Sequence, residues 1–162
     1  MTHIDNTARV AVEGSEYESG WRGPGWTYPN GKILPPMAWT SNPLDMIPDE
    51  GFVYMGSPYS LYRDGYDEAA RLASLAAAAL MFKGLVVYAP IPHGHAVAMH
   101  GVPATWDFWH RPCAPFIEAA SALVVLKLEG WRDSVGLTYE IARFHEAGKP
   151  IVYVTMEELA NG

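Results

Sequence analysis

Residues 122–154 read ALVVLKLEGWRDSVGLTYEIARFHEAGKPIVYV, and this stretch decides the fold class. It opens with residues 122–128, which are apolar except for Lys127 and are typical of a strand buried on both faces. Residues 135–147 then favour a helix that ends at Gly148, and residues 150–154 form a second apolar run. Strand, helix and strand in this order predict a parallel βαβ unit with a right-handed crossover.

The same alternation begins at residue 52. Apolar runs at residues 52–56 and 85–90 predict two more strands, and the Ala-rich residues 64–83 predict a helix between them. We also expect a long loop at residues 91–106, a helix over part of residues 107–120 with its start restricted by Pro112 and Pro115, and a short helix at residues 156–160. The pattern predicts an α/β fold with a doubly wound parallel sheet of about four to five strands.

The first fifty residues have a different composition. They contain six of the thirteen prolines and three of the six tryptophans, without a helical or strand period. We therefore expect two parts, an irregular Pro/Gly/Trp-rich arm at residues 1–50 and a folded domain at residues 51–162. The arm is expected to pack Trp21, Trp26 and Trp39 on the domain or on a partner subunit. The alternative is a disordered N-terminal segment.

Composition excludes several classes of partner. The formal net charge of −7 argues against nucleic acid, since a phosphate backbone requires a basic surface. No apolar run approaches the roughly 20 residues of a membrane span, so no membrane partner is expected. Cys113 is the single cysteine and cannot form an internal disulfide. With no basic, apolar leader at the start of the chain, these features predict a cytoplasmic protein.

In a doubly wound sheet, ligands bind beyond the carboxyl ends of the strands. Three segments leave the expected strands there: residues 56–59, 90–95 and 129–136. In the last of them, Ser134 occupies a helix N-cap position, so the amides that follow it would offer N–H groups to a phosphate. Glu140 lies further along the same helix. It is either a reactive carboxylate or only an acid that interacts with the helix dipole.

The histidines at 93, 95 and 100 raise the question of a metal. Together with Cys113 they match no zinc-binding spacing, and no acids lie nearby to complete a site, so we expect neither a metal nor another cofactor. Cys113 could in principle be a nucleophile with a histidine base, although a lone cysteine is more often a small buried apolar residue.

Three motifs together resemble a known family. They are VYMGSPYS at residues 53–60, LVVYAPIPHGHAVA at residues 85–98 and GWRDSVGLTYEIARFHEAGKP at residues 130–150. Over residues 52–154 the chain is similar to the nucleoside 2-deoxyribosyltransferase superfamily, and more narrowly to members of a bacterial and phage branch that resemble nucleoside 5′-monophosphate N-glycosidases. The resemblance does not extend to the N-terminal arm.

The resemblance implies a flavodoxin-like sheet and chemistry at an N-glycosidic bond. Glu140 matches the glutamate that attacks C1′ of the sugar. Ser134 and Gly136 match the S-x-G-x-x-x-E pattern of the members that act on nucleotides. Transferases that use free nucleosides carry an aspartate at the serine position, where it would repel a 5′-phosphate. The first-loop residues that match sugar and phosphate contacts are Tyr54, Gly56 and Ser57.

One position departs from the family. Where the transferases carry the aspartate that protonates the departing base, this chain has Cys113, whose thiol is a weaker donor. Asp107 or His110 could protonate the base instead, the base could leave with less help, or the nucleotide could bind without hydrolysis. Candidates for the base end of the site are Tyr59, His93, His95 and Trp131, and each of them could equally be a packing residue.

The leading prediction is hydrolysis of a nucleoside 5′-monophosphate to free base and sugar 5-phosphate. Glu140, Asp107 and Cys113 are then the catalytic candidates. A nucleoside 2-deoxyribosyltransferase is the near alternative, which Ser134 disfavours, and a non-catalytic nucleotide-binding or sensing module is the alternative from another class. The resemblance also implies a homodimer or larger homo-oligomer.

Overall fold

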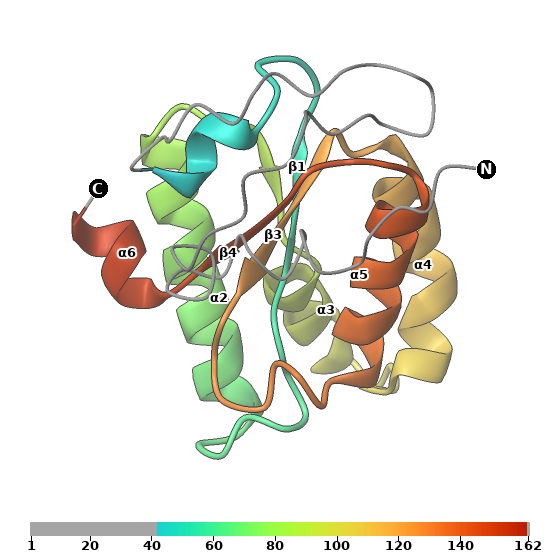
Figure 1. The fold of residues 1–162 in the computed structure, drawn as a ribbon. Helices are drawn as coiled ribbons and strands as arrows, with labels where there is room; N and C mark the ends of the chain where they lie inside the picture. Colours follow the sequence, from blue (N-terminus) through green and yellow to red (C-terminus); the bar gives the residue numbers. More distant parts are fainter. Residues whose placement is uncertain (1–41, 162) are drawn as a thin grey trace.

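The computed structural model describes residues 42–161. Four strands alternate with helices along this part of the chain (Figure 1). The elements are the 3₁₀ helix η2 (Pro43–Met46), β1 (Val53–Gly56), α2 (Tyr66–Phe82), β2 (Val87–Tyr88), α3 (Pro90–Ala98), α4 (Trp106–Ala119), β3 (Ala122–Leu126), α5 (Val135–Glu146), β4 (Ile151–Val154) and α6 (Met156–Asn161).

All four strands are parallel, and their order in the sheet is β2-β1-β3-β4. The chain moves outward from β1 to β2 and then returns to the other side of β1 to form β3. This is the strand order of flavodoxin-like sheets, in which the direction of winding reverses between β1 and β3. The predicted α/β fold with a doubly wound parallel sheet is therefore confirmed.

Helices cover both faces of the sheet (Figure 1). On one face, side chains such as Val53 and Val124 pack with those of α2 and α6. On the other face, Tyr54 and Leu123 pack with those of α4 and α5. Neighbouring residues of one strand point to opposite faces, so both faces need apolar side chains and the strands read as continuous apolar runs.

The helix α2 packs closely because its inward face is made of small residues. Its fully buried side chains include Ala69, Ala73 and Ala76, and Leu80 completes the face. Alanine is also the best helix former, so the same residues favour the helix and a short distance to the sheet. The helix ends before Gly84, whose φ of 90° lies in the left-handed region.

The prediction for residues 85–106 is partly wrong. The second strand is shorter than expected, Val87–Tyr88, and helix α3 occupies Pro90–Ala98, where a loop was expected. Pro90 and Pro92 fall in the first turn of α3, where the missing N–H group of proline has no helical acceptor to lose. Gly94 then packs against the Trp109 ring, which a side chain at this position would contact at 3.4 Å.

Helix α4 is also longer than expected, because Pro112 and Pro115 lie inside it rather than at its start. Each proline removes the hydrogen bond to the carbonyl group four residues earlier. Both prolines are exposed, so these carbonyl groups lie on the solvent side of the helix. The opposite side buries Cys113 and Ile117 against the sheet, and this packing holds the helical path.

The end of the predicted arm belongs to the folded domain. Ile47 is buried in the core that α2 and α6 cover, and Leu44 and Met46 pack against that core. Residues 1–41, with Trp21, Trp26 and Trp39, lie outside the described residues. Among the helices of residues 42–161, none combines the length and apolarity needed to cross a bilayer.

The same substitution at a buried and at an exposed valine shows how much the packing of the core contributes to stability. Val125 in β3 is fully buried, whereas Val135 at the start of α5 is 70% exposed. We expect Val125→Ala to lower the free energy of unfolding by about 2–4 kcal/mol, since it leaves a cavity in the core. Val135→Ala should change it by less than about 0.5 kcal/mol. Urea denaturation measures both values, and equal losses would contradict the described packing.

Candidate active site

The candidate site lies at the edge of the sheet where the strands end, drawn at the bottom of Figure 1. The loop after β1 and the loop after β3 meet there. A methyl group at Gly130 would lie 2.9 Å from Leu61 Cβ, and the φ of Gly130 is 82°. The two loops therefore touch at a position that requires glycine. They adjoin the β1/β3 switch point, where sheets of this type bind ligands.

Glu140 reaches this switch point from α5. The hydroxyl group of Tyr54 in β1 donates a hydrogen bond of 2.6 Å to Glu140 Oε1. The other carboxyl oxygen lies against Gly56 at the end of β1, where a methyl group would come within 2.6 Å of Glu140 Oε2 and of Leu137 Cδ1. Tyr54 orients the carboxyl group, and the missing side chain of Gly56 leaves the space for it.

Burial dominates the chemistry of Glu140. The residue is 5% exposed, and within residues 42–161 no cation lies at ion-pair distance from its carboxyl group. Removal from water raises the pKa of Glu140 from 4.5 to about 8, although the hydrogen bond from Tyr54 acts in the opposite direction. A buried carboxyl group without a cation costs stability, so this arrangement is expected at a functional site rather than at a helix terminus.

Cys113 completes the cluster from α4. It is buried, and its thiol lies beside the Tyr54 hydroxyl group and near Glu140. Burial raises the pKa of the Cys113 thiol, so the thiol stays neutral at physiological pH. The structure thus brings together three residues predicted from separate parts of the sequence: Tyr54, Cys113 and Glu140. The neighbouring Tyr88, whose pKa burial raises to about 12, borders them.

The start of α5 agrees with the prediction of a helix N-cap. The hydroxyl group of Ser134 accepts a hydrogen bond from the Leu137 amide at 3.4 Å. The side chain of Trp106 lies against Gly136, since a methyl group there would come within 2.8 Å of Trp106 Cε3. Glycine at this position is therefore required by packing alone. Sequence reasoning missed Trp106, because it was assigned to the end of a loop.

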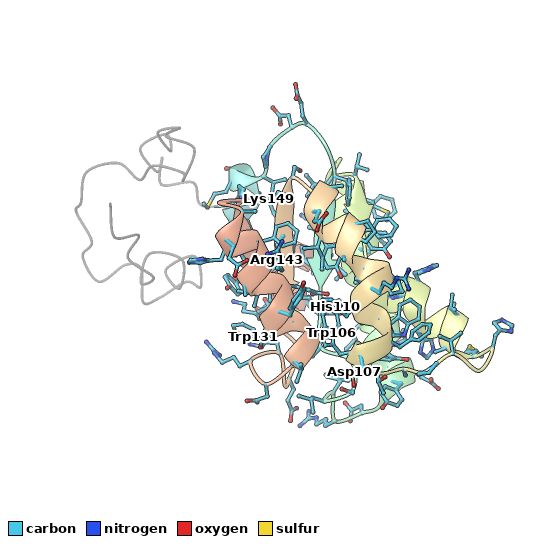
Figure 2. All side chains as sticks on the ribbon, turned by 90° about the vertical axis from the view of Figure 1, so that its right-hand side faces the viewer. Trp106, Asp107, His110, Trp131, Arg143 and Lys149 are labelled. Carbon is cyan, nitrogen blue, oxygen red and sulfur yellow. The ribbon has the colours of Figure 1, made fainter. Side chains whose placement is uncertain are left out.

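Trp106 belongs to an aromatic cluster between α4 and α5. Its ring lies 5.5 Å from the His110 ring and 5.4 Å from the Tyr139 ring. Figure 2 shows Trp106 and His110 between the two helices and Asp107 at the lower end of α4. Asp107 is exposed and lies six positions before Cys113, which is about 9 Å along the helix axis. Asp107 therefore does not join the cluster around Glu140.

Ser57 follows directly after Gly56 in the first loop. It is 6% exposed, and its hydroxyl group has no hydrogen-bond partner within the described part of the chain. Buried hydroxyl groups are normally hydrogen-bonded, so this one stands out. Because it follows Gly56, which lies against the Glu140 carboxyl group, Ser57 remains a candidate polar group of the site.

Three candidates for the base end form two separate contacts. The Tyr59 hydroxyl group lies 2.8 Å from His95 Nδ1, which joins the first loop to α3. His93 is exposed and packs edge-on against Trp109, away from that pair.

Trp131, the fourth candidate for the base end, packs against Tyr153 with ring centroids 5.5 Å apart and carries the Arg132 guanidinium group over its ring. A structural role therefore accounts for His93 and Trp131 without a ligand.

Arg63 and Arg132 belong to the loops at this edge of the sheet, whereas Arg143 and Lys149 lie away from it. Figure 2 shows Arg143 and Lys149 toward the opposite end of α5 from Asp107 and Trp131. Arg143 pairs with Glu146, and Lys149 caps the end of α4 through the Glu118 carbonyl group. Within residues 42–161, no three potential metal ligands are grouped closely enough to hold an ion.

One family model matches the chain. It covers residues 51–156, and the family is described as a domain of unknown function (DUF1937). No curated protein matches the sequence. The match includes every residue of the cluster and both loops at the switch point.

The raised pKa of Glu140 predicts how stability depends on pH. In the unfolded chain the carboxyl group loses its proton near pH 4.5, whereas in the folded protein it keeps the proton up to about pH 8. Between these values the unfolded state gains from ionisation, so the folded state loses relative stability as the pH rises. Glutamine cannot ionise, so we expect the stability of Glu140→Gln not to fall in this way as the pH rises.

The free energy of unfolding of Glu140→Gln minus that of the wild type should therefore rise between about pH 5 and pH 8, by at most about 5 kcal/mol. Glu157→Gln, on the exposed side of α6, is the control. Its free energy of unfolding should depend on pH as that of the wild type does. Urea denaturation at several pH values measures the difference. A constant gap between Glu140→Gln and the wild type would contradict the raised pKa.

Proposed function

The chain belongs to the DUF1937 family, and we propose that it hydrolyses the N-glycosidic bond of a nucleoside 5′-monophosphate to free base and sugar 5-phosphate. The observation that carries the proposal is the buried Glu140 carboxyl group at the β1/β3 switch point, fixed by Tyr54 and adjoining Gly56. This is where the resemblance to nucleoside 2-deoxyribosyltransferases expects the group that reacts at C1′.

Glu140 would act on the sugar. Cleavage of an N-glycosidic bond leaves positive charge at C1′, and a carboxylate beside that carbon stabilises it or forms a covalent bond to it. The proximity of positive charge favours the ionised carboxylate, which offsets the effect of burial on the pKa. The hydrogen bond from Tyr54 holds the carboxyl group in one orientation. Water then releases the sugar 5-phosphate.

The start of α5 would bind the phosphate. The first-turn amides of a helix have no acceptor within the helix and carry the positive end of its dipole. Ser134 uses its oxygen to accept from the Leu137 amide, which leaves the hydroxyl proton free to be donated to a phosphate oxygen. The unpartnered hydroxyl group of Ser57 supplies a second donor from the first loop.

Cys113 supports a second candidate function. Its neutral thiol lies beside Tyr54 and Glu140, where the related transferases carry an acid. A thiol is a weak hydrogen-bond donor, and loss of acid assistance typically costs about 10²–10⁴ in rate. A protein that binds the nucleotide intact would account for this residue. A transferase is less favoured, since Ser134 lacks the carboxylate that would bind a free 5′-hydroxyl group. Either function would operate in the reducing cytoplasm, where a free thiol persists.

The test is release of free base from ribo- and deoxyribonucleoside 5′-monophosphates, separated by HPLC. We expect the wild-type protein to release base, and Glu140→Gln to lower the rate at least about 100-fold, because the amide cannot form a bond to C1′ or balance its charge. Unphosphorylated nucleosides should react poorly, since they lack the group that binds Ser134.

Glu146→Gln provides the matched control on the same helix, where Glu146 is exposed and pairs with Arg143. This variant should keep wild-type activity. Nucleotide binding measured by calorimetry without any release of base would support the binding module instead. An equal loss of activity in both variants would remove Glu140 from its assigned role.

We also propose that the protein forms a homodimer through the edge of the sheet at β2. This edge strand is flanked by exposed apolar side chains, Phe82 at 94% and Val86 at 67% exposure. Phe116, which stacks on Tyr88 of the same strand, is also exposed. Exposed apolar side chains along a strand edge that is unpaired among residues 42–161 favour association with a second copy.

Light scattering with size-exclusion chromatography measures the mass in solution. We expect the mass of a dimer for the wild type and a shift toward the monomer for Val86→Arg, because the new charge would be buried in the interface. Val135→Arg is the control, since Val135 is equally exposed but lies at the start of α5. A monomeric wild-type protein would contradict this assignment.

A further inference from the structure

Tyr59 and His95 form a hydrogen-bonded pair at the edge of the sheet that carries Glu140. The distance between the Tyr59 hydroxyl group and His95 Nδ1 is 2.8 Å, and the rings meet edge to face. The other ring nitrogen, His95 Nε2, lies 3.6 Å from an Asp67 carboxyl oxygen. The three side chains come from the first loop, α3 and α2, so they form one chain of polar groups across three elements.

Tyr59 belongs to the loop that begins at Gly56, the residue that lies against the Glu140 carboxyl group. The loop leaves β1 at Gly56, passes Ser57 with its unpartnered hydroxyl group and reaches Tyr59 two residues later. It then turns back against Gly130 of the loop that precedes α5. The loop is thus held at both ends at the switch point, and Tyr59 lies between these two anchors.

The proposed reaction lacks an acid among the groups already described. A departing base takes the electron pair of the broken bond and needs a proton at its ring nitrogen or oxygen. Cys113 is a neutral thiol and a weak donor, and Asp107 is exposed beyond the cluster. The His110 ring packs edge-on against the Trp106 and Tyr139 rings. Tyr59 is half-buried and keeps its proton, because burial and the neighbouring Tyr66 and Asp67 raise its pKa.

We propose that Tyr59 is the proton donor to the departing base and that His95 is the positioning residue that resupplies its proton, an inference that rests on the proposed glycosidase function. With a protonated imidazole ring, His95 Nδ1–H donates to the Tyr59 oxygen, which leaves the Tyr59 O–H free to point at the base. The Asp67 carboxyl group, 3.6 Å from Nε2, lies within ion-pair distance of the protonated ring.

The step balances without a cofactor. The C1′–N bond breaks, and its electron pair goes to the base while the Tyr59 proton moves to the base. The Nδ1 proton of His95 moves to the Tyr59 oxygen, so the phenol is restored and the ring becomes neutral. The Glu140 carboxylate forms the bond to C1′, and solvent returns the missing proton to His95.

The test compares two leaving groups on the same sugar 5-phosphate. One substrate is the nucleotide that the HPLC panel identifies, and the other is the corresponding 4-nitrophenyl glycoside, whose 4-nitrophenolate leaves without a proton. We expect Tyr59→Phe and His95→Asn to slow release of base at least about 100-fold. Both variants should release 4-nitrophenolate within about threefold of the wild-type rate.

Tyr62→Phe is the matched control, because Tyr62 lies three residues further along the same loop and packs on the core. It should behave like the wild type with both substrates. Equal slowing of both substrates by Tyr59→Phe would overturn the proposal, because loss of loop structure has that effect. Release of 4-nitrophenolate but no base by the wild type would overturn it while supporting the glycosidase. A wild type inert toward both would refute the glycosidase and this inference together.

Discussion

The hydrogen bond from Tyr54 to Glu140 joins the first strand of the sheet to the helix that follows the third, across 86 positions of sequence. It exists because β1 and β3 are neighbours in the sheet, so α5 crosses directly over the end of β1. Its donor is fully buried and packs against Phe144 of the same helix. The strand order, the packing of α5 and the chemical state of the carboxyl group therefore depend on one another.

Two glycines shape the surroundings of this bond. Gly56 removes the side chain that would displace Glu140, and Gly136 removes the one that would displace Trp106 from the start of α5. Burial favours the neutral carboxyl group, whereas the phenol favours the charged form. A cation arriving next to the carboxyl group would decide between them, and a sugar with positive charge at C1′ has that property.

Much of the fold follows from the sequence because continuous apolar runs and Ala-rich helical segments have few other solutions. The error at residues 91–106 arose from treating Pro90, Pro92 and Gly94 as loop residues. Two of them are compatible with a first helical turn, and the third is explained by Trp109, a contact that requires the folded chain. The site was predictable residue by residue through Ser134 and Glu140. The grouping of Cys113 with Tyr54 was not, since it depends on how far α4 lies from the sheet.

The prolines of α4 have a consequence for how the protein opens. Pro112 and Pro115 flank the turn that carries Cys113, and neither can donate a backbone hydrogen bond within the helix. That turn is therefore held in place by side-chain packing more than by its backbone. Cys113 of α4 lies beside the Glu140 carboxyl group, and α4 takes no part in the pairing of the strands. Exposure of the buried carboxyl group on this side would therefore require α4 to leave the sheet, but it would not require the strands to separate.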